Sequence, residues 1–265
     1  MLLGTAALPA AAADSASQIN SKLKAGGEVA WLVEDSTTKD GDLAVLFTSR
    51  LKGRQPAKFP YLVQGDLAPA ETDALNSFDA ASKQTGDRVT MENIVVSLKQ
   101  KRVLARLNLG KPDDEVIYFP GRNHGSLEAV WGSEEGGRRF GVLNLAAKWE
   151  SSAGLLIESD GERLRQLNIK PVLDTKANAF IKTALKSRKG LDPSRFAIHY
   201  RELTVVDPDA GYSVEDPVTI SLRFDAEVPK APEGYPLVEG AMTVRLETTS
   251  DAITAKVLLV GRPKK

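Results

Sequence analysis

The sequence predicts an α+β protein built mainly from antiparallel β-sheet, sandwich-like or half-barrel in shape, with two helices packed on the sheets. Three segments near the C-terminus place apolar residues at every second position: Val218–Phe224, Met242–Leu246 and Ile253–Leu259. Successive side chains of a strand point to opposite faces, so this period indicates one buried and one solvated face. Burial on one face only is typical of antiparallel sheets.

Earlier segments follow the same pattern. Glu28–Asp35 and Leu43–Leu51 are predicted strands, separated by a turn-rich stretch that contains Asp40 and Gly41, a common hairpin signal. Further strands are predicted near residues 89–98, 103–109, 115–119, 127–131, 139–147 and 196–206, with shorter ones at 155–158 and 164–169.

Two segments have helical periodicity instead. Pro69–Lys83 begins with a proline, which suits a first helical turn, and its apolar residues form a single stripe. The second helix is expected to begin at Asp174, whose carboxylate can cap the free amide groups of the first turn. Basic residues precede Gly190 and favour a helix end there.

The order of elements suggests two similar β-rich subdomains, residues 28–147 and 148–265, related by an internal repeat. The segments Gly125–Ala146 and Gly240–Gly261 align without a gap, with apolar residues in phase. The alternative is one continuous α+β domain, because any two half-buried hairpins share this phase.

The N-terminal residues 1–14 are apolar, rich in small residues and end in a run of alanines. They resemble the apolar region and cleavage site of a secretory signal peptide, although no Lys or Arg precedes Lys22. We interpret them as a truncated bacterial export signal, with a short alanine-rich leader as the alternative, and residues 15–27 as a flexible lead-in. A periplasmic or secreted location follows from the first interpretation. No later segment is long and apolar enough for a transmembrane helix.

Composition excludes several classes of function. Lys plus Arg equals Asp plus Glu, at 35 each, which argues against a nucleic-acid-binding protein. The absence of cysteine excludes disulfides, thiolate metal sites and cysteine nucleophiles. No nucleotide-binding or metalloprotease motif is present, so no cofactor is expected.

The two histidines are the candidate catalytic groups. His124 lies in FPGRNHGSLE, two residues before Ser126 and downstream of Asp114, and His199 lies on the predicted strand FAIHYREL. Histidine, serine and carboxylate are the ingredients of a nucleophilic site. No G-x-S-x-G elbow accompanies them, so an exposed loop and the solvated face of a sheet are the simpler interpretations.

Two acidic turns are candidate calcium sites. Asp40 and Asp42 lie in one turn, Asp207 and Asp209 in another, and calcium prefers such oxygen ligands. Neither turn matches an EF-hand loop, and ordinary turn chemistry explains the same residues.

Three hypotheses of function remain. The favoured one is an exported, non-enzymatic protein that binds an apolar small molecule, a cell-envelope ligand or a protein partner on a concave sheet or an exposed edge. The second is a hydrolase that uses His124 or His199 with nearby carboxylates. The third is a structural or adhesive module. β-Rich folds host many unrelated functions, so the fold alone does not decide among them.

Overall fold

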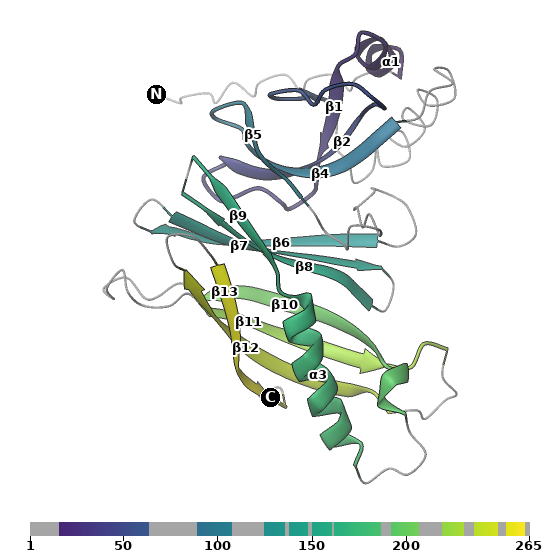
Figure 1. Ribbon diagram of the computed structural model, residues 1–265, viewed down its shortest axis with the longest axis vertical. Coiled ribbons are helices and arrows are strands. Elements are labelled where there is room, and N and C mark those ends of the chain that lie inside the picture. The colour runs from purple at the N-terminus through teal and green to yellow at the C-terminus, as the bar shows by residue number, and fades with distance from the viewer. Residues whose placement is uncertain are drawn as a thin grey trace, which may run out of the picture.

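The computed structural model describes residues 16–63, 89–107, 125–135, 138–147, 150–160, 162–186, 192–206, 219–230, 236–248 and 253–262. In this part of the chain, three β-sheets lie on one another as successive layers, with one helix at the outer end of the first sheet and one beside the last (Figure 1). The strand pairs are antiparallel apart from a short parallel pair between β1 and β3. The predicted α+β class, mainly antiparallel sheet with helices, is therefore confirmed.

The first layer, sheet A, has five strands. In spatial order they are β3 (Tyr61–Leu62), β1 (Glu28–Leu32), β2 (Leu43–Leu51), β4 (Val89–Ser97) and β5 (Arg102–Arg106). The second and third layers each have four strands in sequence order. Sheet B contains β6 (Gly125–Glu135), β7 (Arg138–Ala147), β8 (Glu150–Ser159) and β9 (Leu164–Asn168). Sheet C contains β10 (Ala197–Val206), β11 (Thr219–Glu227), β12 (Val238–Thr248) and β13 (Ile253–Gly261).

Sheet B is buried on both faces. Leu143 and Leu155 belong to the core shared with sheet A, whereas their neighbours Val142 and Leu156 belong to the core shared with sheet C. All four side chains are at most 2% exposed. The central strands therefore need apolar residues at consecutive positions, which explains the unbroken apolar runs in β7 and β8.

Polar contacts fix sheet B against its two neighbours. On the side of sheet A, the Trp131 indole N–H donates to the carbonyl of Ser36 at 2.8 Å. On the side of sheet C, the backbone of Tyr200 in β10 donates to Ser151 Oγ at 2.9 Å and accepts from Asn144 Nδ2 at 2.8 Å. These bonds satisfy buried polar groups that packing of the sheets removes from water.

The predicted flexible lead-in is a helix over most of its length. Helix α1 (Ala16–Lys24) contacts β1 and β2. Ile19 and Leu23 are four residues apart, share one helix face and are at most 1% exposed in the core between sheets A and B. The prediction was wrong here because two apolar residues at helical spacing suffice to bind one short helix to a sheet.

Helix α3 (Lys170–Ala184) packs against sheet C and begins four residues before the predicted Asp174 cap. Pro171 occupies the first turn, and Asn168 Oδ1 accepts the Lys170 N–H at 3.1 Å. Asp174 lies inside the helix, paired with Lys170. The other predicted helix, 69–83, and the predicted end at Gly190 lie outside the described residues.

The predicted boundary at residues 147 and 148 falls between β7 and β8, which pair from Arg139 with Ser159 to Ala147 with Glu150. A division there would cut through sheet B. The two hairpins that align in sequence also occupy different places, the first two strands of sheet B and the last two of sheet C. Among the described helices, none has the length and apolar character needed to cross a membrane.

Candidate functional site

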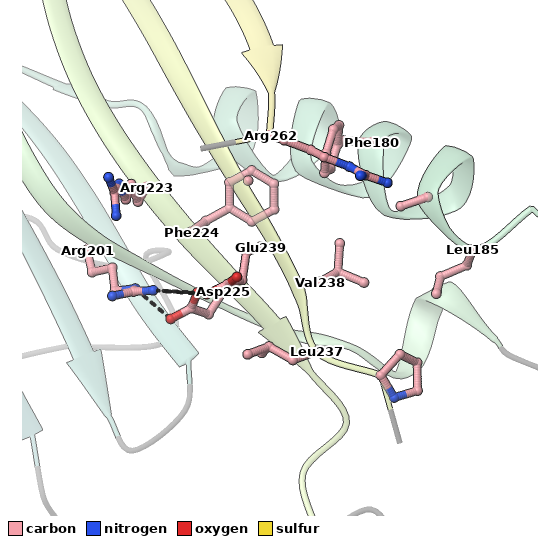
Figure 2. A pocket seen from close by; sticks show the side chains of 13 residues that line it. Phe180, Leu185, Arg201, Arg223, Phe224, Asp225, Leu237, Val238, Glu239 and Arg262 are labelled. Atoms are coloured by element: carbon pink, nitrogen blue, oxygen red, sulfur yellow. Dashed lines mark hydrogen bonds and ion pairs between the residues drawn. The ribbon is translucent and has the colours of Figure 1, made fainter. Parts of the chain in front are cut away.

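A pocket of about 620 Å³ lies at one end of sheet C, beside the last turn of α3 (Figure 2). Small-molecule sites typically measure roughly 300–1,000 Å³, so its size suits a small ligand. Its wall is lined by Phe180, Ala184, Leu185, Arg201, Arg223, Phe224, Asp225, Pro236, Leu237, Val238, Glu239, Gly240 and Arg262.

The pocket exists because β13 ends before β12 does. The last pair between these strands joins Gly261 to Ala241, whereas β12 continues to pair with β11 as far as Val238. Within the described residues, Val238–Gly240 therefore has a sheet neighbour on one side only.

The α3 side of the pocket is apolar and rigid. Phe180 meets the fully buried ring of Phe224 edge-on at 5.9 Å, and Tyr200 meets the same ring at 6.3 Å. The Tyr200 hydroxyl donates to Asp174 at 2.8 Å, and Asp174 pairs with Lys170 at 2.6 Å. Burial, and then the Asp174 charge, raise the pKa of Tyr200, so its hydroxyl stays a donor. The aromatic wall is thus fixed to the first turn of the helix.

Leu237 supplies the exposed apolar surface. Leu237 is 54% exposed, which is more than any other large apolar residue in the described part of the chain. The neighbouring Val238 is buried, and so is Leu185, which directly follows α3. An apolar molecule in the pocket would cover Leu237 and gain the free energy of removing that surface from water.

The opposite side of the pocket carries an ion-pair cluster. Arg201 Nε and Nη2 contact the two carboxylate oxygens of Asp225 at 2.6 and 2.9 Å, and Arg201 lies 3.6 Å from Glu239. Figure 2 shows this cluster across the pocket from Phe180 and Leu185. The site therefore offers an apolar wall and a charged wall to one ligand.

A bulge in β10 shapes the charged wall. The register of β10 shifts between Arg201 and Thr204, and Glu202 has a φ of 51°, in the left-handed region. Because of this bulge, Glu202 reaches both Arg201 at 3.0 Å and Arg223 at 3.1 Å. Strained, non-glycine positions of this kind cluster at functional sites.

The candidate catalytic residues do not come together in the described part of the chain. His199 lies half-buried on β10, opposite Asp225 in the ladder, and Ser126 is exposed on β6. The His199 imidazole has no hydrogen bond or ion pair with another described residue. His124 and Asp114 lie outside the described residues.

Glu128 on β6 is an electrostatic neighbour of His199. Burial raises the pKa of its carboxyl, and this effect outweighs the hydrogen bonds from the Leu203 backbone and the Asn144 side chain and the charge of His199. A carboxyl and an imidazole thus interact at the junction of sheets B and C. Neither residue lines the pocket at the end of sheet C.

The calcium candidates Asp40 and Asp42 both contact protein groups. Arg139 contacts both carboxylate oxygens of Asp40 at 2.8 and 3.2 Å, and Asp42 accepts from Ser97 Oγ at 2.6 Å. No group of three or more possible metal-ligating His, Asp or Glu side chains occurs in the described ranges. Asp207 and Asp209 lie outside them.

The sequence did not single out the residues of the pocket. Arg201 and Arg223 fall on the solvated face of predicted strands, where charged residues are ordinary, and Asp225 directly follows one of these strands. Only the strand register brings Arg201 opposite Arg223, a pairing of like charges that needs nearby carboxylates. That register is not visible in the periodicity of any single strand.

Comparison with protein-family models, with curated proteins and with solved structures gives no match for this chain.

Proposed function

We propose that this chain is a non-enzymatic binding protein that takes up the apolar part of a small molecule in the pocket at the end of sheet C. The observation that carries the proposal is the exposed Leu237 in a pocket of about 620 Å³ whose other wall is the fixed Phe180 ring. An exported location, in contact with the cell envelope, belongs to the same proposal.

The interior of the protein supports this pocket over a site between helix and sheet. Leu173, Ala177 and Ile181 of α3 are at most 2% exposed in the core that they share with sheets B and C. The helix therefore packs directly on the protein core along its buried face. The pocket lies at the end of the helix, where Phe180 and Leu185 line it.

A hydrolase centred on a histidine has less support in the described residues. Such a site needs a carboxylate or hydroxyl within hydrogen-bond distance of an imidazole, inside a cleft. His199 has the electrostatic neighbour Glu128 but lines no part of the pocket described above. The binding hypothesis has a site of suitable size, and we take it as the function best supported.

The test is isothermal titration calorimetry with dodecyl maltoside below its critical micelle concentration. This neutral amphiphile probes the apolar wall without a charged group. We expect saturable binding to the wild-type protein and a loss of at least about tenfold in affinity for Leu237→Asp, because a carboxylate replaces the exposed apolar surface.

The matched control is Leu32→Asp, since Leu32 is 40% exposed at the end of β1 in sheet A. This variant should bind the probe like the wild-type protein. Absence of binding to the wild-type protein, or equal loss in both variants, would refute the proposed pocket.

A further inference from the structure

We infer that the ligand of this pocket is an anionic amphiphile, whose negative head group is held by Arg262. The inference rests on the proposed function and adds the charge of the ligand. Its basis is the way in which the charges around the pocket are already paired.

The pocket is lined by three arginines and two acidic residues: Arg201, Arg223, Arg262, Asp225 and Glu239. Arg201 contacts both acidic residues. Arg223 pairs with Glu202, which also contacts Arg201 and so is shared between two guanidinium groups. The carboxylates near the pocket are thus engaged by Arg201 and Arg223.

Arg262, the third arginine of the pocket, takes no part in these ion pairs. It follows the last residue of β13, is exposed, and has no ion pair or hydrogen bond with another described residue. Figure 2 shows Arg262 on the same side of the pocket as Phe180, away from the Arg201 and Asp225 pair. A positive charge therefore accompanies the apolar wall.

A second hollow, of about 390 Å³, adjoins the pocket on the outer face of sheet C. Arg223 and Arg262 line both hollows. The hollow lies where two small residues, Ala241 and Gly261, are opposite each other in the sheet, next to Arg223 on the neighbouring strand. Three hydroxyl-bearing residues, Thr204, Ser221 and Thr243, also line it, together with Glu202, Leu222 and Met242. The Glu202 carboxylate is paired with Arg201 and Arg223.

The two arginines thus stand between an apolar pocket and a hydroxyl-lined hollow. Guanidinium groups bind carboxylate and phosphate oxygens through paired N–H donors, and hydroxyl groups add further donors. A molecule with an apolar tail and an anionic head matches this arrangement, with the tail against Phe180 and Leu237 and the head at Arg262. The pocket volume indicates one small molecule rather than a membrane surface.

The experiment compares three probes with the same dodecyl tail by isothermal titration calorimetry below their critical micelle concentrations: dodecanoate, dodecyl maltoside and dodecyltrimethylammonium. We expect dodecanoate to bind about tenfold more tightly than dodecyl maltoside, from one charge-assisted interaction at a solvent-accessible site. The cationic probe should bind most weakly.

Arg262→Gln should remove the preference for dodecanoate over dodecyl maltoside. The matched control is Arg245→Gln, because Arg245 lies on β12 and lines neither hollow. It should retain the preference.

Each other outcome is decisive. If the neutral probe binds and dodecanoate has no advantage, or Arg262→Gln and Arg245→Gln behave alike, the anionic head group is refuted and the proposed function stands. If no probe binds, the proposed function itself fails. If vesicles containing phosphatidylglycerol bind and monomeric dodecanoate does not, the arginines serve a lipid surface and the small-molecule inference is overturned.

Discussion

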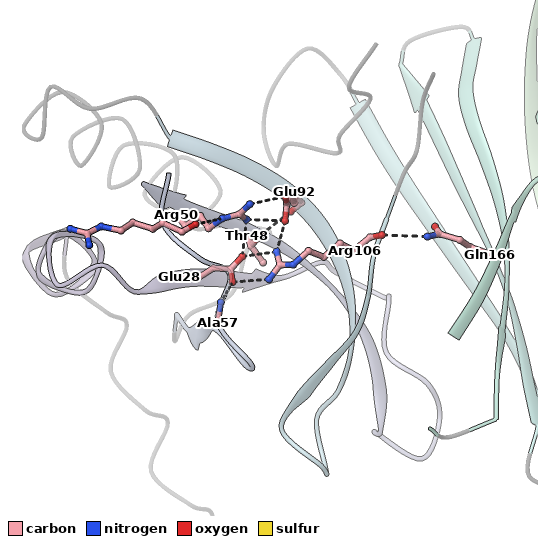
Figure 3. A network of polar contacts seen from close by, with 8 residues as sticks. Glu28, Thr48, Arg50, Ala57, Glu92, Arg106 and Gln166 are labelled. Atoms are coloured by element: carbon pink, nitrogen blue, oxygen red, sulfur yellow. Dashed lines mark hydrogen bonds and ion pairs between the residues drawn. The ribbon is translucent and has the colours of Figure 1, made fainter. Parts of the chain in front are cut away.

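The carboxylate of Glu28 and the guanidinium of Arg106, from opposite parts of sheet A, share two hydrogen bonds of 2.9 Å (Figure 3). Glu28 has a fully buried side chain and also accepts the Ala57 N–H at 2.9 Å. Arg50 bridges to Glu92 through two further bonds of 2.9 Å, and Arg106 also contacts Glu92. Four charges on four strands thus form one network on the face of sheet A that is turned away from sheet B.

Replacing Glu28 with Gln should lower the free energy of unfolding by about 3 kcal/mol, because the arginines would lose a carboxylate that is buried with them. Urea denaturation measures this change. Glu162→Gln is the matched control: Glu162 is exposed, so its loss should fall within about 0.5 kcal/mol. A Glu28→Gln variant as stable as that control would show that the network adds nothing to stability.

Asp40 should make the protein sensitive to acid. The hydrogen bonds from Arg139, and then from Thr38, hold the pKa of its carboxyl well below the usual range. A carboxyl with a lowered pKa in the folded state stabilises the protein above its unfolded pKa of about 3.9, and this stabilisation is lost as the pH falls. Asp40→Asn should therefore be less stable than wild type at pH 7 but lose less stability on acidification.

The measurement is the urea midpoint from pH 7 down to pH 3 for both proteins. Asp40 is partly exposed, so we predict the direction of the difference and a modest size. Parallel pH profiles for the two proteins would contradict the role of the pair between Asp40 and Arg139.

Gly240 should tolerate no side chain. A Cβ atom at this position would overlap the ring of Phe224, whose own side chain is fully buried and cannot move away. Gly240→Ala should lower the free energy of unfolding by about 2 kcal/mol through overpacking. Gly261→Ala, at a position where a Cβ atom meets nothing within 4 Å, is the control and should leave stability within about 0.5 kcal/mol of wild type. Equal effects in thermal unfolding would refute the contact.

The periodicity of single strands predicted much of the fold correctly. Ile220, Leu222 and Phe224, which alternate in the sequence, are all at most 2% exposed in β11. In β13 the alternation fails after Val257, since a bulge shifts the register and Val260 packs against the core while Leu258 is 45% exposed. The alternation of apolar residues before a bulge does not indicate that an extra residue follows, so the bulge could not be predicted from it.

The candidate site could not be predicted from strand periodicity either, because it depends on how several elements are placed relative to one another. Its wall combines α3, three strands of sheet C and Arg262, which follows the fourth. Phe180 and Leu237 are ordinary apolar residues in the sequence, and the pocket depends on where β13 stops relative to β12. The histidines attracted attention for their chemistry, whereas the pocket follows from strand lengths and register.

The most direct test of the pocket is a titration of ¹⁵N-labelled protein with dodecanoate, followed by amide chemical shifts. We predict saturable changes at the amides of Phe180, Leu185, residues 237–240 and Arg262, with the amides of Leu32 and its neighbours in sheet A unaffected. Changes centred on sheet A, or no changes at probe concentrations approaching the critical micelle concentration, would contradict the assignment of the binding site to the end of sheet C.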